Sequence, residues 1–169
     1  MNIMEVRKAT YDDIPRIMKI CDEARGIMRS NGNFSQWISG YPSEEQILKD
    51  IDNSVGYIIN DGKGDAGYFA FVPGIEKTYI EIEEGEWLDD SKPYCTIHRL
   101  ASTASSKGIA ETCFEWCWEQ SKNIRIDTHR DNKIMHHCIE KYGFTYCGII
   151  HLEDGAPRIA FQKIDKRKR

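Results

Sequence analysis

The spacing of hydrophobic residues along the chain predicts alternating helices and strands. Apolar residues recur every three or four positions in four segments, each flanked by capping or breaking residues. These predicted helices span residues 10–29, 44–51, 108–121 and 133–141. Short apolar or alternating runs predict strands over residues 3–9, 56–59, 66–72, 79–83, 95–102, 124–127, 145–151 and 158–163. Because helices return between strands, the pattern predicts an α/β sandwich built on a mixed sheet.

Composition narrows the class of protein. The 169 residues are most simply one domain spanning 1–169, with 40% hydrophobic and 30% charged residues as in ordinary globular proteins. No apolar run approaches the roughly 20 residues of a membrane helix, and residues 1–7 contain no signal core. We therefore expect a cytoplasmic protein with no membrane partner. The net charge of −4 argues against nucleic acid as a partner.

The cysteines and histidines form no recognisable disulfide or metal motif. The six cysteines include no CxxC pair, and we expect reduced, mostly buried thiols, with Cys113 and Cys117 on one core-facing side of a helix. A zinc site would have to draw on Asp127, His129, His136, His137 and Cys138. Their spacing matches no structural zinc motif, so we expect no metal.

A strand, a loop of small residues and a helix follow one another over residues 96–120. The loop consists mostly of Ser, Ala and Gly, whose small side chains allow a ligand to approach the backbone. The predicted helix begins at Gly108, and a helix N-terminus offers unpaired N–H groups and a positive dipole to a phosphate. Residues 96–110 therefore indicate either a phosphate or pyrophosphate site or an ordinary strand-to-helix turn.

Two motifs in this half of the chain resemble those of the GNAT acetyltransferase superfamily. Residues 105–110, Ser-Ser-Lys-Gly-Ile-Ala, fill the family's loop pattern Gln/Arg-x-x-Gly-x-Gly/Ala, with Ser105 in place of Gln or Arg. Downstream, a strand, Asn132, a helix and Gly143-Phe144 follow in the family's order. The resemblance implies an α/β/α fold whose mixed, largely antiparallel sheet has about six or seven strands flanked by about four helices.

The resemblance also implies acetyl-CoA as co-substrate and direct attack of a primary amine on its thioester in a ternary complex. The backbone N–H of Leu100 stands at the family's oxyanion position, and the strand edge up to Ser102 pairs with pantetheine amides. The cofactor-binding residues that the resemblance implies are Leu100, Ala101, Ser102, Ser105, Ser106, Lys107, Gly108, Ile109, Ala110 and Asn132. A non-catalytic acyl-CoA-binding or sensing module remains the alternative, because Ser105 and Ile139 replace family residues.

The sequence does not single out one residue for each proton transfer in this reaction. His98 lies on the same side of its strand as the position where some family members place a glutamate, and an ordinary imidazole pKa suits proton removal near neutral pH. A structural role for His98, the alternative bases Glu81 and Glu83, and a water relay stay open. Tyr142 is the nearest hydroxyl in sequence to Ile139, which occupies the position of the family's thiol-protonating tyrosine.

The amine acceptor is expected between the first two helices. Trp37 and Tyr41, with Phe34, form an aromatic wall there, and Glu81 and Glu83 begin an acidic segment that attracts a cationic amine. Core packing and a solvated loop explain the same residues equally well. The expected partner is a small-molecule or peptide amine, and a homodimer is left open.

Overall fold

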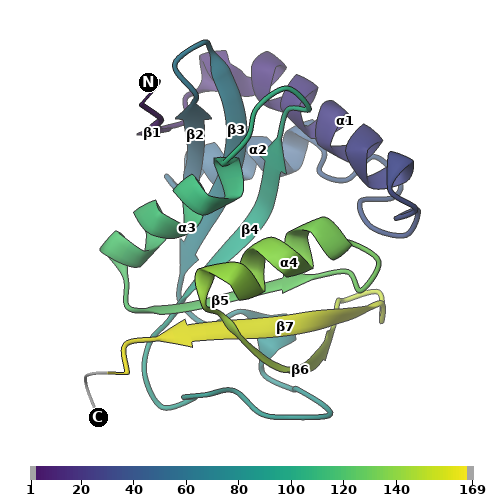
Figure 1. The fold of residues 1–169 in the computed structure, drawn as a ribbon, viewed down its shortest axis with the longest axis vertical. Helices are drawn as coiled ribbons and strands as arrows, with labels where there is room; N and C mark the ends of the chain where they lie inside the picture. The colour runs from purple at the N-terminus through teal and green to yellow at the C-terminus, as the bar shows by residue number, and fades with distance from the viewer. Residues whose placement is uncertain (1–2, 167–169) are drawn as a thin grey trace.

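One seven-stranded mixed sheet organises residues 3–166, the part of the chain that the computed structural model describes (Figure 1). Its strands lie in the order β1-β2-β3-β4-β5-β7-β6, and all neighbours are antiparallel except β4 and β5. The strands are β1 (Glu5–Lys8), β2 (Gly56–Asn60), β3 (Asp65–Pro73), β4 (Cys95–Ser102), β5 (Asn123–Thr128), β6 (Thr145–His151) and β7 (Pro157–Ile164). The predicted α/β fold with a largely antiparallel mixed sheet is confirmed.

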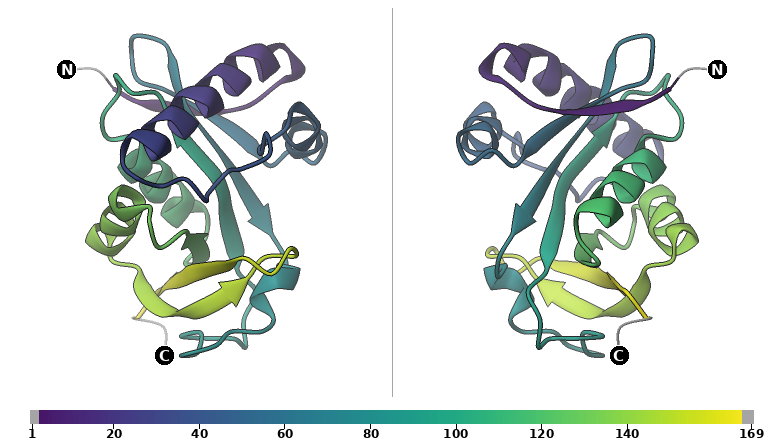
Figure 2. Two further views of the ribbon diagram at one scale, coloured as in Figure 1. Left: turned by 90° about the vertical axis from the view of Figure 1, so that its right-hand side faces the viewer. Right: turned by 90° about the vertical axis from the view of Figure 1, so that its left-hand side faces the viewer.

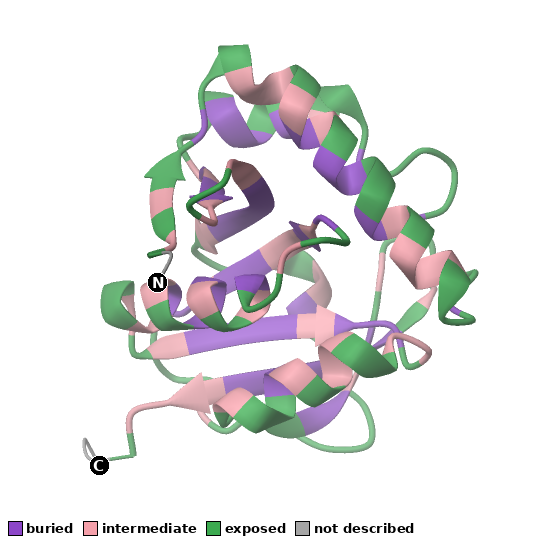
Figure 3. Ribbon diagram, turned by 45° about the horizontal axis from the view of Figure 1, so that its top comes forward, coloured by how far each residue is buried: buried purple, intermediate pink, exposed green. Residues whose placement is uncertain are grey.

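Four α-helices within these residues cover the two faces of the sheet (Figure 2). They are α1 (Ile14–Ser30), α2 (Glu44–Asp52), α3 (Ile109–Gln120) and α4 (Lys133–Tyr142). The first two pack on one face with Ile58 and Tyr68, whereas α3 and α4 pack on the other with Ile59 and Phe69. Adjacent residues of one strand thus enter opposite cores, as strand alternation requires. Buried residues follow the strands and the inner sides of the helices (Figure 3).

Local capping explains where the helices begin and end. Ser43 Oγ accepts a hydrogen bond from Gln46 N (3.1 Å) at the start of α2, and Asn132 Oδ1 accepts one from Met135 N (3.1 Å) at the start of α4. Gly143, with a φ of 106°, ends α4 in the left-handed conformation. All four predicted helices are confirmed, with small shifts at their ends. None of the helices found in residues 3–166 has the length and apolar character needed to cross a membrane.

The predicted strand over residues 79–83 is wrong. A short 3-10 helix, η2 (Lys77–Tyr79), occupies its start, and the remainder is loop. Tyr79 is buried in a third core cluster, where its ring packs on Trp87 and its hydroxyl donates to Asp127. These contacts with a distant part of the chain outweigh the local alternation of apolar and acidic residues.

The parallel strands β4 and β5 separate after a short contact. Their pairing ends at Ile97 opposite Ile126, while β4 remains paired with β3, so the sheet splits between β4 and β5 (Figure 1). Opposite Phe69 the register between β3 and β4 shifts, and Arg99 and Leu100 together face that position as a β-bulge. Arg99 adopts a φ of 55°, which is uncommon for a residue other than glycine.

A buried salt bridge holds this bulge. Arg99 Nε and Nη2 donate to the two carboxylate oxygens of Asp50 on α2, at 2.9 and 2.7 Å, and the two side chains are 9% and 3% exposed. Tyr68 Oη also donates to Asp50 Oδ2, at 2.7 Å. Each carboxylate oxygen therefore has a donor, which a buried charge pair requires to be tolerated in the interior. The contact ties α2 to the point where β4 leaves β5.

Asp50→Ala is expected to lower the free energy of unfolding by about 3–5 kcal/mol, because Arg99 would be left as a buried charge without its partner. Urea denaturation followed by circular dichroism measures the loss. Asp22→Ala is the matched control, since it removes an exposed ion pair with Arg25 on α1, and it should cost less than about 1 kcal/mol. Equal losses in the two variants would contradict the anchoring role of Asp50.

Candidate active site at the splayed strands

A cavity of about 900 Å³ opens where β4 leaves β5. It is lined by the bulged part of β4, the end of β5, the segment between α1 and α2, the start of α4 and the turn between β6 and β7. These parts are far apart in the sequence and converge at the split in the sheet (Figures 1 and 2). The volume is in the range of small-molecule sites.

The segment between α1 and α2 lacks regular structure but is fixed by side-chain hydrogen bonds. The Arg29 guanidinium donates to the backbone oxygens of Asn33, Gln36 and Trp37 at 2.8–3.0 Å. Gln36 Oε1 accepts from Asn33 Nδ2 (2.8 Å) and from Asn132 Nδ2 (3.0 Å), which links the segment to α4. This wall of the cavity is therefore positioned by side-chain contacts.

Two of the three predicted aromatic wall residues line the cavity. Trp37 is buried and meets the ring of Tyr41 edge-on, with centroids 6.4 Å apart. The Tyr41 hydroxyl accepts a hydrogen bond from Arg99 Nη1 at 3.0 Å. Phe34 is 67% exposed and does not line the cavity. The aromatic wall thus consists of one buried ring and one ring whose hydroxyl is held by the bulge.

His98 and two carboxylates form the polar part of the cavity next to the bulge. His98 Nε2 lies 3.5 Å from Glu76 Oε1, and Tyr79 Oη donates to Asp127 Oδ2 at 2.5 Å. Burial, together with the charge of Arg99, lowers the pKa of His98 to about 3, and burial raises the pKa of Asp127. His98 is therefore neutral at pH 7. The expectation of an ordinary imidazole pKa is wrong because the ring is desolvated.

The edge of β4 that faces the split carries the expected oxyanion position. Leu100 lies in the bulge and lines the cavity. Because β5 no longer pairs with β4 beyond Ile97, the segment from His98 to Ser102 lies along the split. Backbone groups on such an edge can pair with an extended ligand as an added strand would.

The loop after β4 leads from this edge to the N-terminus of α3. Ser105, Lys107 and Gly108 are exposed, and Gly108, with a φ of 82°, precedes a helix that no side chain of residues 3–166 caps. The first N–H groups of α3 thus lack helix and side-chain partners, an arrangement that suits a phosphate. The side chains of Ala101 and Ile109 are buried in the core, so only their backbone groups are available to a ligand.

Comparison with known proteins identifies the family. No family model and no curated protein matches the chain. The crystal structure of a GNAT-family acetyltransferase from Streptococcus agalactiae is 35% identical, covers 96% of both chains and has a TM-score of 0.89. The chain belongs to the GNAT acetyltransferase family.

Two more distant solved structures share the fold of this GNAT acetyltransferase. The yncA protein of Salmonella typhimurium, solved with its cofactor acetyl-CoA, is 13% identical over 99% of this chain and 98% of that chain, with a TM-score of 0.63. The NatC complex bound to Gag peptide and CoA contains a chain that is 13% identical, with 98% of this chain and 100% of that chain covered and a TM-score of 0.64. At this identity the likeness concerns the fold.

Three residues expected in the GNAT site lie away from the cavity. Tyr142 packs on Phe114, with ring centroids 5.6 Å apart, and Ile139, at the family's tyrosine position, is fully buried. Glu81 and Glu83 are exposed on the loop between η2 and β4, because the strand predicted for them does not form. We therefore assign no catalytic role to Tyr142, Glu81 or Glu83.

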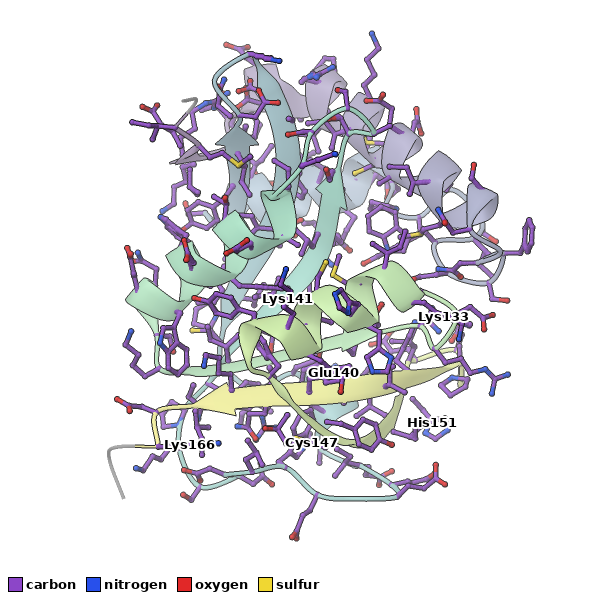
Figure 4. All side chains as sticks on the ribbon, viewed as in Figure 1. Lys133, Glu140, Lys141, Cys147, His151 and Lys166 are labelled. Carbon is purple, nitrogen blue, oxygen red and sulfur yellow. The ribbon has the colours of Figure 1, made fainter. Side chains whose placement is uncertain are left out.

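His136 on α4 contacts a carboxylate of its own helix and the core residue Phe161. His136 Nε2 lies 2.9 Å from Glu140 Oε1, one turn along the helix. Glu140 and Lys141 lie on the exposed side of α4 (Figure 4). Residues 3–166 contain no group of three or more His, Cys, Asp or Glu side chains arranged to hold a metal ion. Cys113 and Cys117 are fully buried in the core, as predicted.

Two charged residues that shape the cavity, Asp50 and Arg158, belong to no motif in the sequence. The helical spacing in the sequence does indicate that Asp50 is buried, because it places Asp50 on the same face of α2 as the buried Ile47 and Ile51. This position predicts a buried carboxylate, but it does not identify Arg99 as the partner, since the two residues are 49 positions apart. Arg158 lies in an ordinary strand pattern and offers no such signal.

Lowering the pH from 7 to 5 is expected to reduce the free energy of unfolding by about 1–2 kcal/mol through His98 alone. Its pKa in the folded protein is far below the ordinary 6.5, so the unfolded chain takes up a proton as the pH falls through that value and the folded protein does not. This contribution to stability is complete above about pH 7 and is lost towards pH 3. Urea denaturation at both pH values should show a smaller drop in His98→Gln than in the wild type. An equal drop would contradict the desolvation of His98.

Proposed function

We propose that this GNAT enzyme transfers an acetyl group from acetyl-CoA to a primary amine by direct attack in a ternary complex. The observation that carries the proposal is the split between β4 and β5. Along β4 it brings together the polar cavity, the open strand edge and the loop to the uncapped start of α3. A related fold solved with acetyl-CoA, in yncA, supports a CoA thioester as the donor.

The donor is expected to lie along β4. The N–H groups of residues 108–110 and the Lys107 side chain receive the pyrophosphate, and the strand edge from Leu100 to Ser102 pairs with the pantetheine amides. The thioester oxygen then meets the Leu100 N–H. Asn132 contributes less than the family resemblance implies. Its Oδ1 caps α4 and its Nδ2 donates to Gln36, which leaves one N–H for the pantetheine arm.

The acceptor is expected to enter from the cavity. Glu76 and Asp127 attract an ammonium group, which must lose a proton before it attacks. The neutral His98 relays this proton: one ring nitrogen accepts it while Nε2 passes a proton to Glu76, whose Oε1 lies 3.5 Å away, so the ring with its low pKa does not itself become charged. The amine nitrogen then bonds to the thioester carbon, and the Leu100 N–H stabilises the oxyanion. Collapse breaks the C–S bond, releases the thiolate and, after loss of the second nitrogen proton to water, leaves the amide.

The leaving thiolate needs no tyrosine in this scheme. Ile139 is aliphatic and Tyr142 packs on Phe114 outside the cavity, so neither donates a proton. A thiol has a pKa of about 8.5, and its anion can leave and take a proton from water. The chemistry therefore depends on amine deprotonation and on the oxyanion contact.

The experiment that tests the proposal couples thiol release from acetyl-CoA to a panel of primary amines. We expect amine-dependent thiol release, with the amide product identified by mass spectrometry. Stabilisation by CoA without transfer to any amine would instead support a non-catalytic acyl-CoA-binding module.

Ala110→Glu is expected to abolish thermal stabilisation by CoA while the fold is retained. Ala110 is the second residue of α3, where a glutamate suits the helix dipole but its charge repels the pyrophosphate. Gly108 is a poorer position for the test, because its φ of 82° strains any other residue. Ala110 is half-buried; Ile134→Glu, at the same second position of α4 but exposed, is the control and should keep the stabilisation. Unchanged stabilisation in Ala110→Glu would remove α3 from the donor site.

His98→Ala is expected to lower kcat by about 100-fold with little change in the KM for acetyl-CoA, because the amine loses its proton acceptor. Tyr142→Phe should stay within about threefold of the wild type, since its ring lies outside the cavity. Steady-state thiol release with the best amine of the panel measures both rates. A His98→Ala rate within threefold of the wild type would transfer the role to Glu76 or water.

A further inference from the structure

Arg158 is a buried cation in the wall of the cavity. It is 8% exposed and lines the cavity beside the β6–β7 turn. Within residues 3–166 its guanidinium makes one hydrogen bond, from Nη1 to the backbone oxygen of the neighbouring Pro157 at 2.9 Å, and no ion pair. A guanidinium carries five N–H donors, and a buried charge without an ion-pair partner is costly. The position of Arg158 therefore indicates an anion that the protein itself does not supply.

The nearby carboxylates are engaged with other groups. Burial lowers the pKa of Arg158, and the charges of Asp127 and Asp154 only partly offset this effect. Asp127 accepts the hydroxyl of Tyr79, and Asp154 accepts the N–H of Ala156 within the β6–β7 turn. Neither carboxylate is placed to receive the guanidinium directly.

The hydroxyl of Tyr41 is a second donor in the same cavity. Its oxygen accepts from Arg99 Nη1 at 3.0 Å, and Asp50 holds Arg99 in place. Because a cation occupies one side of the oxygen, the hydroxyl hydrogen points elsewhere, and within residues 3–166 no acceptor receives it; Tyr41 is 40% exposed, so this hydrogen is open to solvent or to a ligand. Tyr41 also lies close enough to Arg158 to influence its pKa. Two donor groups with N–H or O–H hydrogens not taken by the described residues thus line the same cavity.

This donor pair lines the same cavity as His98. Asp127 pairs with Ala160, and Arg158, two residues along β7, shares that face of the sheet. β5 lies between β4 and β7, β4 has already separated from β5 at His98, and Arg158 lies two residues along β7 from the partner of Asp127, so the backbones of Arg158 and His98 are more than two strand spacings apart, which is over about 10 Å. Both side chains line the cavity and shorten this gap. An acceptor that reaches both groups must therefore be long enough to span the part of the cavity between β4 and β7.

We propose that Arg158 and Tyr41 bind a carboxylate of the acceptor, and that the acceptor is an amino acid. Its amine is received at His98 and Glu76, and its carboxylate pairs with the Arg158 guanidinium in the bidentate geometry that suits these two groups. The Glu76 carboxylate repels the acid end, so the opposite charges fix the direction in which the acceptor enters. This inference rests on the proposed acetyl transfer and adds the substrate class.

The experiment compares amino acids with their neutral carboxamides as acceptors. The panel holds the common α-amino acids, β-alanine, γ-aminobutyrate and δ-aminovalerate, each assayed by thiol release from acetyl-CoA beside its carboxamide. For the best acid, we expect a wild-type kcat/KM about 100-fold above that of the carboxamide. Arg158→Gln should reduce this ratio to below about fivefold, and Arg158→Lys should restore part of it. An amino acid and its carboxamide differ in the pKa of the amine, and this difference affects the wild type and the variant equally. Dividing the acid-to-amide ratio of the variant by that of the wild type therefore removes it.

Two further variants separate the carboxylate contact from general effects. Arg130→Gln removes an exposed arginine that does not line the cavity, and the acid-to-amide ratio should be unchanged. Tyr41→Phe should lower the ratio about tenfold through loss of one hydrogen bond to a charged group. This variant keeps the test decisive if Arg158→Gln fails to fold.

The inference is overturned if the ratio in Tyr41→Phe and a folded Arg158→Gln stays near the wild-type value. It is also overturned if the wild type acetylates carboxamides or simple amines as well as acids. Both results leave acetyl transfer to an amine intact. Absence of transfer to every acid, amide and amine in the panel would instead remove the proposed function, and the amino-acid acceptor with it.

Discussion

The separation of β4 from β5 is the constraint on which the rest of the structure depends. Two parallel strands that pair only up to Ile97 leave a gap in an otherwise continuous sheet. The gap persists because the bulge at Arg99 turns β4 away, and the buried Asp50 carboxylate fixes that arginine from α2. The strand edge, the cavity and the route to α3 all follow from this divergence. A conventional β4, without the bulge, would close the space in which the chemistry is proposed.

Three buried arginines show how one side chain serves different purposes in this fold. Arg99 is matched by a bidentate carboxylate and anchors the bulge. Arg125 lies between the rings of Trp87 and Tyr94, 4.0 and 3.8 Å from their centroids, and secures the loop before β4. Arg158 forms no ion pair and no ring contact within residues 3–166, although the charges of Asp127 and Asp154 act on it. This contrast is what separates a structural arginine from one available to a substrate.

Much of the fold could be predicted because its signals are local. The caps Ser43 and Asn132 and the stop at Gly143 mark helix ends in the sequence, and alternation marks most strands. The exception, the strand expected at residues 79–83, fails because the burial of Tyr79 against Trp87 is a long-range contact.

The candidate active site is harder to predict, because the burial and the hydrogen-bond partners of its side chains depend on residues that are distant in the sequence. The small-residue loop and Leu100 could be located from their motif; Leu100 lines the cavity, and the loop joins β4 to α3. The His98 pKa could not be foreseen, since it depends on desolvation in the folded sheet. For the same reason the helix position of Tyr142 does not predict its contacts, because its ring packs on Phe114 on the α3–α4 side of the sheet.

The central claim is that the thioester carbonyl lies at the split, against the Leu100 N–H and beside His98. A crystal structure with an unreactive acetyl-CoA analogue, in which a CH₂ group separates sulfur from the acetyl carbonyl, tests it most directly. The account predicts pantetheine between β4 and β5, with the carbonyl oxygen about 2.7–3.2 Å from Leu100 N and the methyl ketone open to the cavity. An analogue bound outside the split, or one whose carbonyl points away from Leu100, would contradict it.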